Sequence, residues 1–157
     1  MNPNAKDRPS SIPWPPIIYA VALAGAWLLE SWLPLPALPE NLLVRWFGAA
    51  IFLSGLGLGL VGLMALRAVG TTFDPTGPAD ALATQGLYAR SRNPLYLSAL
   101  IAFFGLGLAL RSTWLFVAVP AVAVALTKLA IEPEEAYLER CFGEAYRGYK
   151  AQVRRWI

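Results

Sequence analysis

The stretch Gly86-Leu-Tyr-Ala-Arg-Ser-Arg-Asn-Pro-Leu-Tyr96 lies between two apolar segments and decides how the chain is organised. Arg90 and Arg92 flank a serine, and Asn93-Pro94 follows directly. Proline disfavours the α region in the residue before it and is well placed at the first position of a helix. The sequence therefore predicts a helix that begins at Pro94, with a basic segment just outside it. Two cations at the entrance of an apolar helix are equally typical of a positive-inside anchor.

The composition indicates a membrane protein. Of the 157 residues, 57% are hydrophobic and 15% are charged, whereas soluble domains carry roughly a quarter charged residues. We expect one membrane domain over residues 1–157, with a two-helix part (1–67) followed by a second part (68–157). We also expect the apolar run near the N-terminus to be a retained anchor, since no small-residue cleavage site is evident. No nucleic-acid partner is expected.

The rarest side chains restrict the chemistry. The single cysteine, Cys141, excludes an intrachain disulfide and a multi-cysteine metal site, and there is no histidine. The usual general base at neutral pH and the usual metal ligand are therefore absent. We expect no metal site, and any chemistry must use carboxylates, arginines, tyrosines, backbone groups or a bound cofactor.

Hydrophobicity predicts an all-α polytopic protein with four transmembrane helices, at residues 14–33, 44–66, 94–110 and 113–131. The last two form an antiparallel hairpin around Arg111-Ser112, and Pro120 is expected to kink the fourth helix. The second span contains Gly-Leu-Gly-Leu-Gly-Leu-Val-Gly at 55–62. No strand precedes these glycines, so we interpret them as small residues that permit close helix contact, and not as a nucleotide-binding loop.

The distribution of Lys and Arg predicts the topology. These residues concentrate before the first span, in the 68–93 connection and after the last span, whereas the other two loops contain only Arg45 and Arg111. Both termini are then cytoplasmic, and the 68–93 connection meets the C-terminal segment on one cytoplasmic face.

The segment 132–156 is predicted to be one amphipathic cytosolic helix. Its apolar side has Leu138, Phe142, Ala145, Tyr146, Tyr149 and Val153, and its polar side has Arg140, Glu144, Arg147, Lys150 and Arg154. A helix lying on the membrane surface would show the same pattern. Glu134 and Glu135, however, project onto the apolar side, where carboxylates need a partner.

Five pieces of sequence, in this order, resemble a known superfamily. They are Gly70-Thr-Thr-Phe-Asp-Pro75, Gly86-Leu-Tyr88, Ser91-Arg-Asn-Pro-Leu-Tyr96, Glu134-Glu-Ala-Tyr-Leu138 and Phe142-Gly-Glu-Ala-Tyr-Arg-Gly-Tyr149. The combination over residues 70–157 resembles the isoprenylcysteine carboxyl methyltransferase and phospholipid methyltransferase superfamily of integral membrane enzymes. The first two predicted spans match it only in being apolar.

The resemblance implies an S-adenosylmethionine-dependent methyltransferase, of EC 2.1.1 type, in an integral membrane location such as the bacterial inner membrane. It implies that residues 68–157 bind the methyl donor at the cytoplasmic surface, between the third and fourth spans and the C-terminal helix. The acceptor would be isoprenylcysteine-like, a lipid or another lipophilic molecule that arrives from the bilayer.

The resemblance also selects a site. We expect the catalytic residues to be Arg92 and Glu135, and the cofactor-binding residues to be Tyr88, Arg92, Asn93, Pro94, Tyr96, Glu134, Glu135, Tyr146 and Tyr149. An arginine suits the donor's carboxylate, a glutamate its amine or ribose, and tyrosines its adenine. Backbone groups of residues 129–131 are further candidates. Asn93 occupies the place of a histidine that is common in the family. An asparagine side chain can still form hydrogen bonds there, but it cannot accept or release a proton.

Other interpretations stay open at this stage. Glu134 and Glu135 would also suit salt bridges to Arg90 and Arg92, and Tyr146 and Tyr149 would suit interfacial anchors. Thr72 and Pro75 would suit a loop that closes the site or merely shapes the chain. The fold is also compatible with a scaffold that lost activity, or with a nicotinamide-dependent reductase-like relative.

Overall fold

The computed structural model describes residues 12–38, 40–70 and 81–157, and all regular structure in these ranges is helical. The long helices are α1 (Trp14–Trp32), α2 (Leu42–Ala68), α3 (Pro94–Leu110) and α4 (Thr113–Leu126). A 3₁₀ turn, η1 (Gly86–Ala89), precedes α3. A π-helical turn, η2 (Thr127–Ile131), leads from α4 into α5 (Glu132–Phe142), and α6 (Glu144–Gln152) follows. The predicted start of a helix at Pro94 is confirmed, with Pro94 at its first position.

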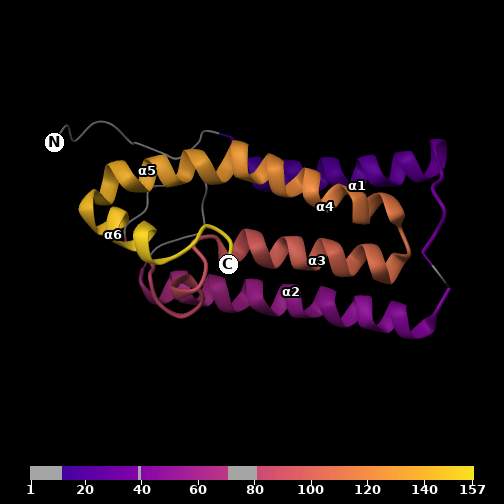
Figure 1. Ribbon diagram of the computed structural model, residues 1–157, viewed down its shortest axis with the longest axis horizontal. Helices are drawn as coiled ribbons and strands as arrows, with labels where there is room; N and C mark the ends of the chain where they lie inside the picture. Colours follow the sequence, from indigo (N-terminus) through magenta and orange to yellow (C-terminus); the bar gives the residue numbers. More distant parts are fainter. Residues whose placement is uncertain (1–11, 39, 71–80) are drawn as a thin grey trace.

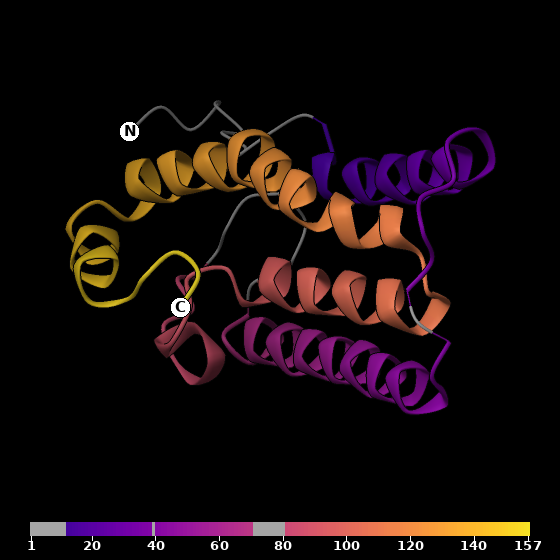
Figure 2. The same ribbon diagram turned by 45° about the vertical axis from the view of Figure 1, so that its right-hand side comes forward.

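The four long helices pack in the order α1, α4, α3 and α2 (Figures 1 and 2). The buried core lies where α1, α3 and α4 meet and extends into η2. It consists of Ile18, Ala26, Tyr96, Phe103, Leu115, Val122, Leu126, Ala130 and Ile131. The predicted antiparallel hairpin of α3 and α4 is confirmed, and Arg111 turns the chain with φ 59°.

Close contact between α2 and α3 depends on glycines. Gly48, Gly55 and Gly62 recur at seven-residue spacing and are the buried residues of α2. A Cβ on Gly55 would lie 2.6 Å from the backbone nitrogen of Ala102, and a Cβ on Gly105 would overlap the backbone of Phe52. For the stretch 55–62, the interpretation of its glycines as helix-packing residues is confirmed at Gly55, Gly59 and Gly62, whereas a Cβ on Gly57 would meet nothing within 4 Å.

At the opposite end from α5 and α6, polar contacts join the end of α1 and the connection from α1 to α2 (residues 33–41) to the turn between α3 and α4. The hydroxyl of Ser112 donates to Glu30 (2.7 Å), and the indole of Trp114 donates to the backbone carbonyl of Leu33 (2.8 Å). Arg111 donates to the carbonyl of Leu38 (3.0 Å) and pairs with Glu40 (3.1 Å). Glu30 thus finds a hydrogen-bond donor although it belongs to a largely apolar helix.

Ser112→Ala tests this fastening. The Ser112 hydroxyl also caps α4 by accepting from the backbone N–H of Leu115 (3.2 Å). The variant loses the cap and leaves Glu30 without this donor, so we expect the stability to fall by about 1–2 kcal/mol. Thermal unfolding of the detergent-purified protein measures it. Ser54→Ala is the matched control, because the Ser54 hydroxyl is exposed and bonds only Ala50 of its own helix. Equal midpoints for the two variants would contradict this account.

Two helices among the described residues are long and apolar enough to cross a membrane. They are Leu42–Ala68 and the continuous helix Thr113–Phe142, and Pro94–Leu110 is a shorter apolar helix. The bounds of α1 and α3 match the predicted first and third segments within one residue. All four predicted segments are therefore helical, but only two of them meet the length and hydropathy expected of a membrane span.

The predicted C-terminal helix over residues 132–156 is wrong in two respects. The fourth apolar helix continues into α5 through the π turn, so Glu132 does not begin a separate helix. The helix then breaks at Gly143, whose φ of 53° is readily adopted by glycine, and α6 ends at Gln152. Because the periodicity is interrupted at Gly143, Ala145 is exposed although the continuous pattern placed it on the apolar side.

Candidate functional site

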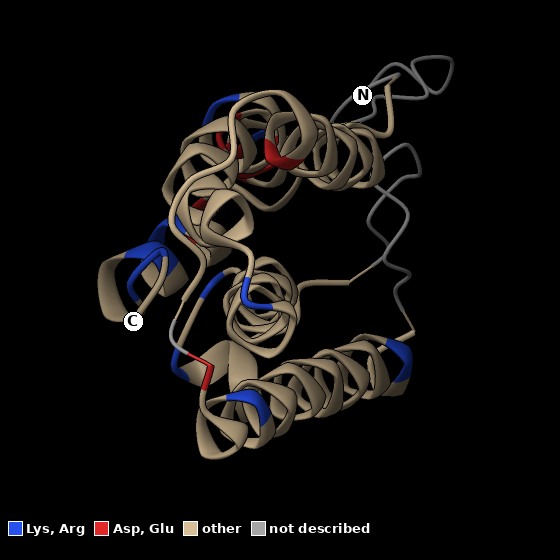
Figure 3. Ribbon diagram, turned by 90° about the vertical axis from the view of Figure 1, so that its right-hand side faces the viewer, with Lys and Arg blue, Asp and Glu red and all other residues tan. Residues whose placement is uncertain are grey.

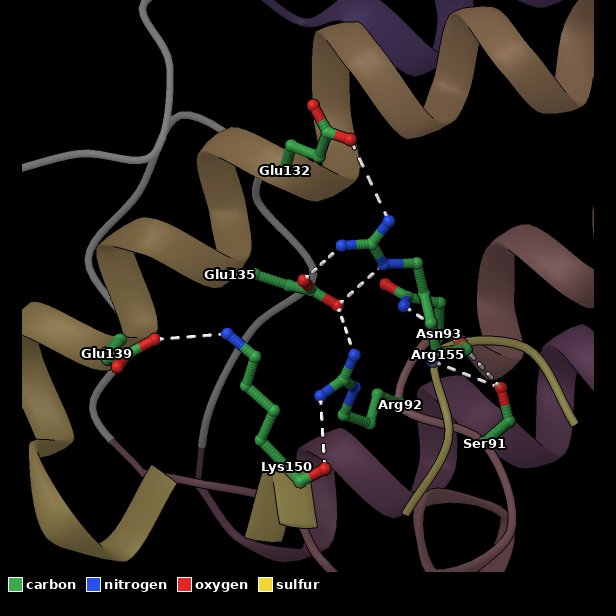
Figure 4. A network of polar contacts seen from close by, with 8 residues as sticks. All are labelled: Ser91, Arg92, Asn93, Glu132, Glu135, Glu139, Lys150 and Arg155. Atoms are coloured by element: carbon green, nitrogen blue, oxygen red, sulfur yellow. Dashed lines mark hydrogen bonds and ion pairs between the residues drawn. The ribbon is translucent and has the colours of Figure 1, made fainter. Parts of the chain in front are cut away.

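Three separate segments converge at one end of the molecule, and their polar contacts are shown in Figure 4. They are residues 86–97 (η1, the loop that follows it and the first turn of α3), the helix α5, and the tail after α6 (residues 153–157). The polar stretch 86–96 and the Glu134–Glu135 pair, which the sequence predicts to meet, do lie together here. Figure 3 looks along the bundle from the other end. Arg45, in the first turn of α2, and Arg111, at the end of α3, belong to that end.

Glu135 lies at the centre of this cluster between two arginines. Its Oε1 is 2.9 Å from Arg92 and accepts from Nε of Arg155 at 3.1 Å, and its Oε2 accepts from the other side of the Arg155 guanidinium at 2.8 Å. Glu135 is 6% exposed. A buried carboxylate requires such partners, because a charge left unpaired away from water is costly.

Arg92 is held more tightly than a surface arginine. Its side chain is 9% exposed, and besides Glu135 it donates to the backbone carbonyl of Lys150 at 3.4 Å. Its Nε–H is buried and finds no acceptor among the described residues. Buried polar groups nearly always have a partner, so an unpaired N–H marks a place where an acceptor would be stabilised.

The loop before α3 is bonded to the tail after α6. The backbone N–H of Arg92 donates to the carbonyl of Arg154 (3.0 Å), and the side-chain amide of Asn93 donates to the carbonyl of Arg155 (3.0 Å). The hydroxyl of Ser91 lies 3.4 Å from the same carbonyl and accepts from the Asn93 N–H at 3.2 Å. Ser91 and Asn93 are both buried, and these bonds satisfy polar groups that water does not reach.

Two further hydrogen bonds order the tyrosines. Tyr96 donates its hydroxyl to Oε2 of Glu134 at 2.9 Å, which joins α3 to α5. Tyr149 donates to the backbone carbonyl of Tyr88 at 2.7 Å, which joins α6 to η1. The rings of Tyr146 and Tyr149 lie 6.2 Å apart, and both residues are buried, so the interfacial-anchor interpretation of this pair is wrong.

The phenol groups of Tyr88, Tyr146 and Tyr149 stay protonated at neutral pH. Burial raises the pKa of Tyr149 to about 12, although the charge of Arg92 acts in the opposite direction. Burial also raises the pKa of Tyr88 and of Tyr146, and the nearby Glu134 and Glu135 respectively add to the effect. The three tyrosines can therefore donate hydrogen bonds or pack against a ligand, but they do not act as bases.

The structure brings together all nine residues of the predicted site. Pro94 starts α3 and is buried beside Asn93. Arg90 is exposed and makes no ion pair with the described residues, so only Arg92 fulfils the expected salt bridge. In the segment 129–131, Ala130 and Ile131 are buried in the π turn. Thr72 and Pro75 lie outside the described residues, and Cys141 is exposed.

Sequence reasoning missed Arg155 and Ser91. Arg155 was counted only as one of the basic residues of the C-terminus, because a helix continued through Gly143 gave it no reason to approach Glu135. Its real position results from the end of α6 at Gln152 and the extended backbone of Val153, with φ −118° and ψ 130°. The signal that could have found it is the excess of carboxylates, since Glu132, Glu134 and Glu135 lie in the first turn of α5 and Arg92 supplies a single positive charge.

Comparison with known proteins gives one family and one relative. The family model of phospholipid methyltransferases matches residues 43–145. An uncharacterized protein of Haemophilus influenzae (strain ATCC 51907 / DSM 11121 / KW20 / Rd) is 36% identical over 63 residues, which is 40% of this chain and 100% of that protein. No solved structure matches the chain.

The family match covers α2, α3, α4, α5 and the start of α6, and it includes the loop with Arg92 and the helix with Glu135. Tyr146, Tyr149 and Arg155 of the cluster lie just beyond the matched region, which extends over more than half of the sequence. The resemblance seen in the sequence motifs is therefore confirmed at the level of the family. Together with the two long apolar helices, it indicates an integral membrane protein. The chain belongs to the phospholipid methyltransferase family.

Proposed function

We propose that this protein transfers a methyl group from S-adenosylmethionine to a hydrophobic acceptor that reaches it from the membrane. The observation that carries the proposal is the buried ion pair of Arg92 and Glu135, whose two residues both lie within the region matched by a methyltransferase family. When bound, the donor supplies an electrophilic methyl group on a sulfonium, so the protein's own part is binding and orientation.

The residues of the cluster fit this donor. The unpaired Nε–H of Arg92 calls for an acceptor, and the donor offers a carboxylate and ribose hydroxyls. Glu134 uses Oε2 for Tyr96, and no donor among the described residues reaches its Oε1. That oxygen is suited to an ammonium or a hydroxyl. The residues proposed to hold the donor are Tyr88, Arg92, Asn93, Pro94, Tyr96, Glu134, Glu135, Tyr146 and Tyr149.

The chemistry expected of these residues is positional. Holding a donor and an acceptor in line removes much of the entropic cost of a displacement reaction. The chain has no histidine, and the phenols of Tyr88, Tyr146 and Tyr149 stay neutral, so these side chains do not act as bases. A carboxylate or thiolate acceptor needs no base and is favoured over an ammonium. The acceptor class remains isoprenylcysteine-like, lipid or small lipophilic.

A methyl-transfer assay tests the proposal. Purified protein in vesicles that contain extracted bacterial lipids is given a donor with a labelled methyl group, and label is counted in the organic extract. We expect protein-dependent label in that extract, and none with Arg92→Ala. The proposal would be contradicted if the protein failed to bind the donor and also transferred no methyl group to any of three acceptors. These acceptors are lipids, an isoprenylated cysteine and small lipophilic thiols. Oxidation of a nicotinamide cofactor instead would indicate a reductase.

We further propose that both termini and the donor site face the cytoplasm. Most described Lys and Arg residues belong to α5, α6, the tail after α6 and the loop before α3, while Arg45 at the start of α2 and Arg111 at the end of α3 lie at the other end of the bundle. In membrane proteins the cytoplasmic side is the richer in these residues.

Reporter fusions measure this orientation. A fluorescent protein fused after Ile157 is expected to fluoresce in bacterial cells, because it folds in the cytoplasm, and alkaline phosphatase at the same place is expected to be inactive. The reverse pattern would contradict the orientation. A second pair of fusions within residues 33–40, at the other end of the bundle, supplies the control and is expected to give the opposite result.

A further inference from the structure

The tail after α6 is bound back into the molecule at the start of α3 (Figures 1 and 2). Val153 takes an extended conformation that ends α6. Three residues further on, Trp156 packs against the buried core that contains Tyr96 and Ile131. Arg155 lies between these two points, so its backbone position is set from both sides.

Arg155 contacts both halves of the cluster. Its guanidinium makes two hydrogen bonds to Glu135 of α5, at 3.1 and 2.8 Å, in the fork geometry typical of strong arginine–carboxylate pairs. Its backbone carbonyl accepts from the amide of Asn93 and lies within reach of the Ser91 hydroxyl. One tail residue therefore connects the carboxylate of α5 to the loop that carries Arg92.

The contact with Asn93 fixes which way its amide points. Only the nitrogen of a side-chain amide can donate to a carbonyl, so the bond to Arg155 directs Nδ2 toward the tail. The oxygen, Oδ1, is left as an acceptor, and no donor among the described residues reaches it. Asn93 is buried, and rotation would exchange a satisfied pair for an unsatisfied one.

Glu135 depends on Arg155 in the same way. Arg92 pairs with Oε1 of Glu135, whereas among the described residues the hydrogen bond to Oε2 comes from Arg155. Without the Arg155 fork, the ion pair with Arg92 would remain, but both hydrogen bonds that orient the carboxylate would be lost. The unpaired N–H of Arg92, which this carboxylate helps to hold in place, would lose its fixed direction as well.

We propose that Arg155 is a positioning residue of the donor site, which sets the orientation of Glu135 and Asn93 without itself touching the donor. The inference rests on the proposed function for the identity of the ligand. The tail is then a structural part of the site. Its sequence affects donor affinity indirectly, because Arg155 holds the side chains of Glu135 and Asn93 in place.

Three variants test this role. Arg155→Met removes the fork but keeps an unbranched side chain, and Arg155→Lys keeps the charge without the fork geometry. Arg154→Met is the matched control, because the Arg154 side chain is exposed and only its backbone carbonyl is used. Binding of S-adenosylhomocysteine to the detergent-purified full chain is measured by calorimetry, and hydrogen–deuterium exchange is followed over residues 86–97.

We expect Arg155→Met to weaken binding about tenfold or more, the value of a lost hydrogen bond to a charged group. Arg155→Lys is expected to recover part of the affinity, and Arg154→Met to bind as the wild type does. Exchange in residues 86–97 rises in Arg155→Met and is unchanged in Arg154→Met.

If Arg155→Met leaves both hydrogen exchange and affinity unchanged, the inference is overturned. It is also overturned if exchange becomes faster while affinity stays at the wild-type value, because the contact is then purely structural. Wild-type protein that binds no S-adenosylhomocysteine would overturn the proposed function instead. In that case the exchange measurement still decides whether Arg155 holds the loop before α3.

Discussion

Glu135→Gln is expected to abolish donor binding, with a loss of affinity of about 100-fold or more. The substitution keeps the size of the side chain but removes the negative charge that lies between Arg92 and Arg155. Two guanidinium groups then face each other across a neutral amide, and one of them is 9% exposed. Such a pair of cations separates, which displaces the loop that carries Arg92 and Asn93. Calorimetric titration with S-adenosylhomocysteine measures the change.

Glu139→Gln provides the matched control for this experiment. Glu139 lies one turn further along α5 and pairs with Lys150 at 3.2 Å, but its side chain is 34% exposed. Exposed ion pairs contribute little, so Glu139→Gln is expected to bind as the wild type does. Both variants should keep the helical circular dichroism of the wild type, because the core residues of α1, α3 and α4 other than Tyr96 lie outside the cluster. Wild-type affinity in Glu135→Gln would show that the cluster only holds the helices together.

Gly105→Ala is expected to give the largest loss of stability. The added methyl would overlap the backbone of Phe52 and lie 2.7 Å from the carbonyl oxygen of Gly48. Backbone atoms cannot move aside by a change of rotamer, so α2 and α3 must separate. We expect a cost of up to about 3 kcal/mol, or about 5–10 °C in the unfolding midpoint.

Gly57→Ala is the control for that substitution. A Cβ at Gly57 meets nothing within 4 Å, and alanine favours a helix over glycine. Its midpoint should equal or exceed that of the wild type. Gly55→Ala should behave like Gly105→Ala, because its Cβ would lie 2.6 Å from the nitrogen of Ala102. If all three variants unfold together, the close approach of α2 and α3 does not stabilise the protein.

The sequence predicts well what local rules determine. Pro94 starts α3, Arg111-Ser112 turns the chain, and the glycine-rich stretch 55–62 of α2 lies against α3. The meeting of Arg92 with Glu135 was also predictable, because a glutamate on an apolar helix side needs a cation.

What the sequence did not predict depends on a single backbone angle. The apolar pattern from Leu138 to Tyr149 continues across Gly143, so periodicity alone supports one helix, and only the positive φ of Gly143 reveals the break. Once the chain turns there, the tail returns to the bundle and brings Arg155 to Glu135. Helical periodicity cannot predict the contact between Arg155 and Glu135, since Arg155 lies after the end of α6. The identity of the acceptor is not encoded in the cluster either.

The central claim is that the cluster around Arg92 and Glu135 binds a methyl donor. Calorimetric titration of the detergent-purified wild-type protein with S-adenosylhomocysteine tests it most directly, because this product resembles the donor and is not consumed. Nicotinamide dinucleotide, titrated in parallel, gives the comparison. The account predicts saturable binding of one S-adenosylhomocysteine per chain and none of the dinucleotide. Folded protein that binds no S-adenosylhomocysteine, or that binds the dinucleotide in its place, would contradict it.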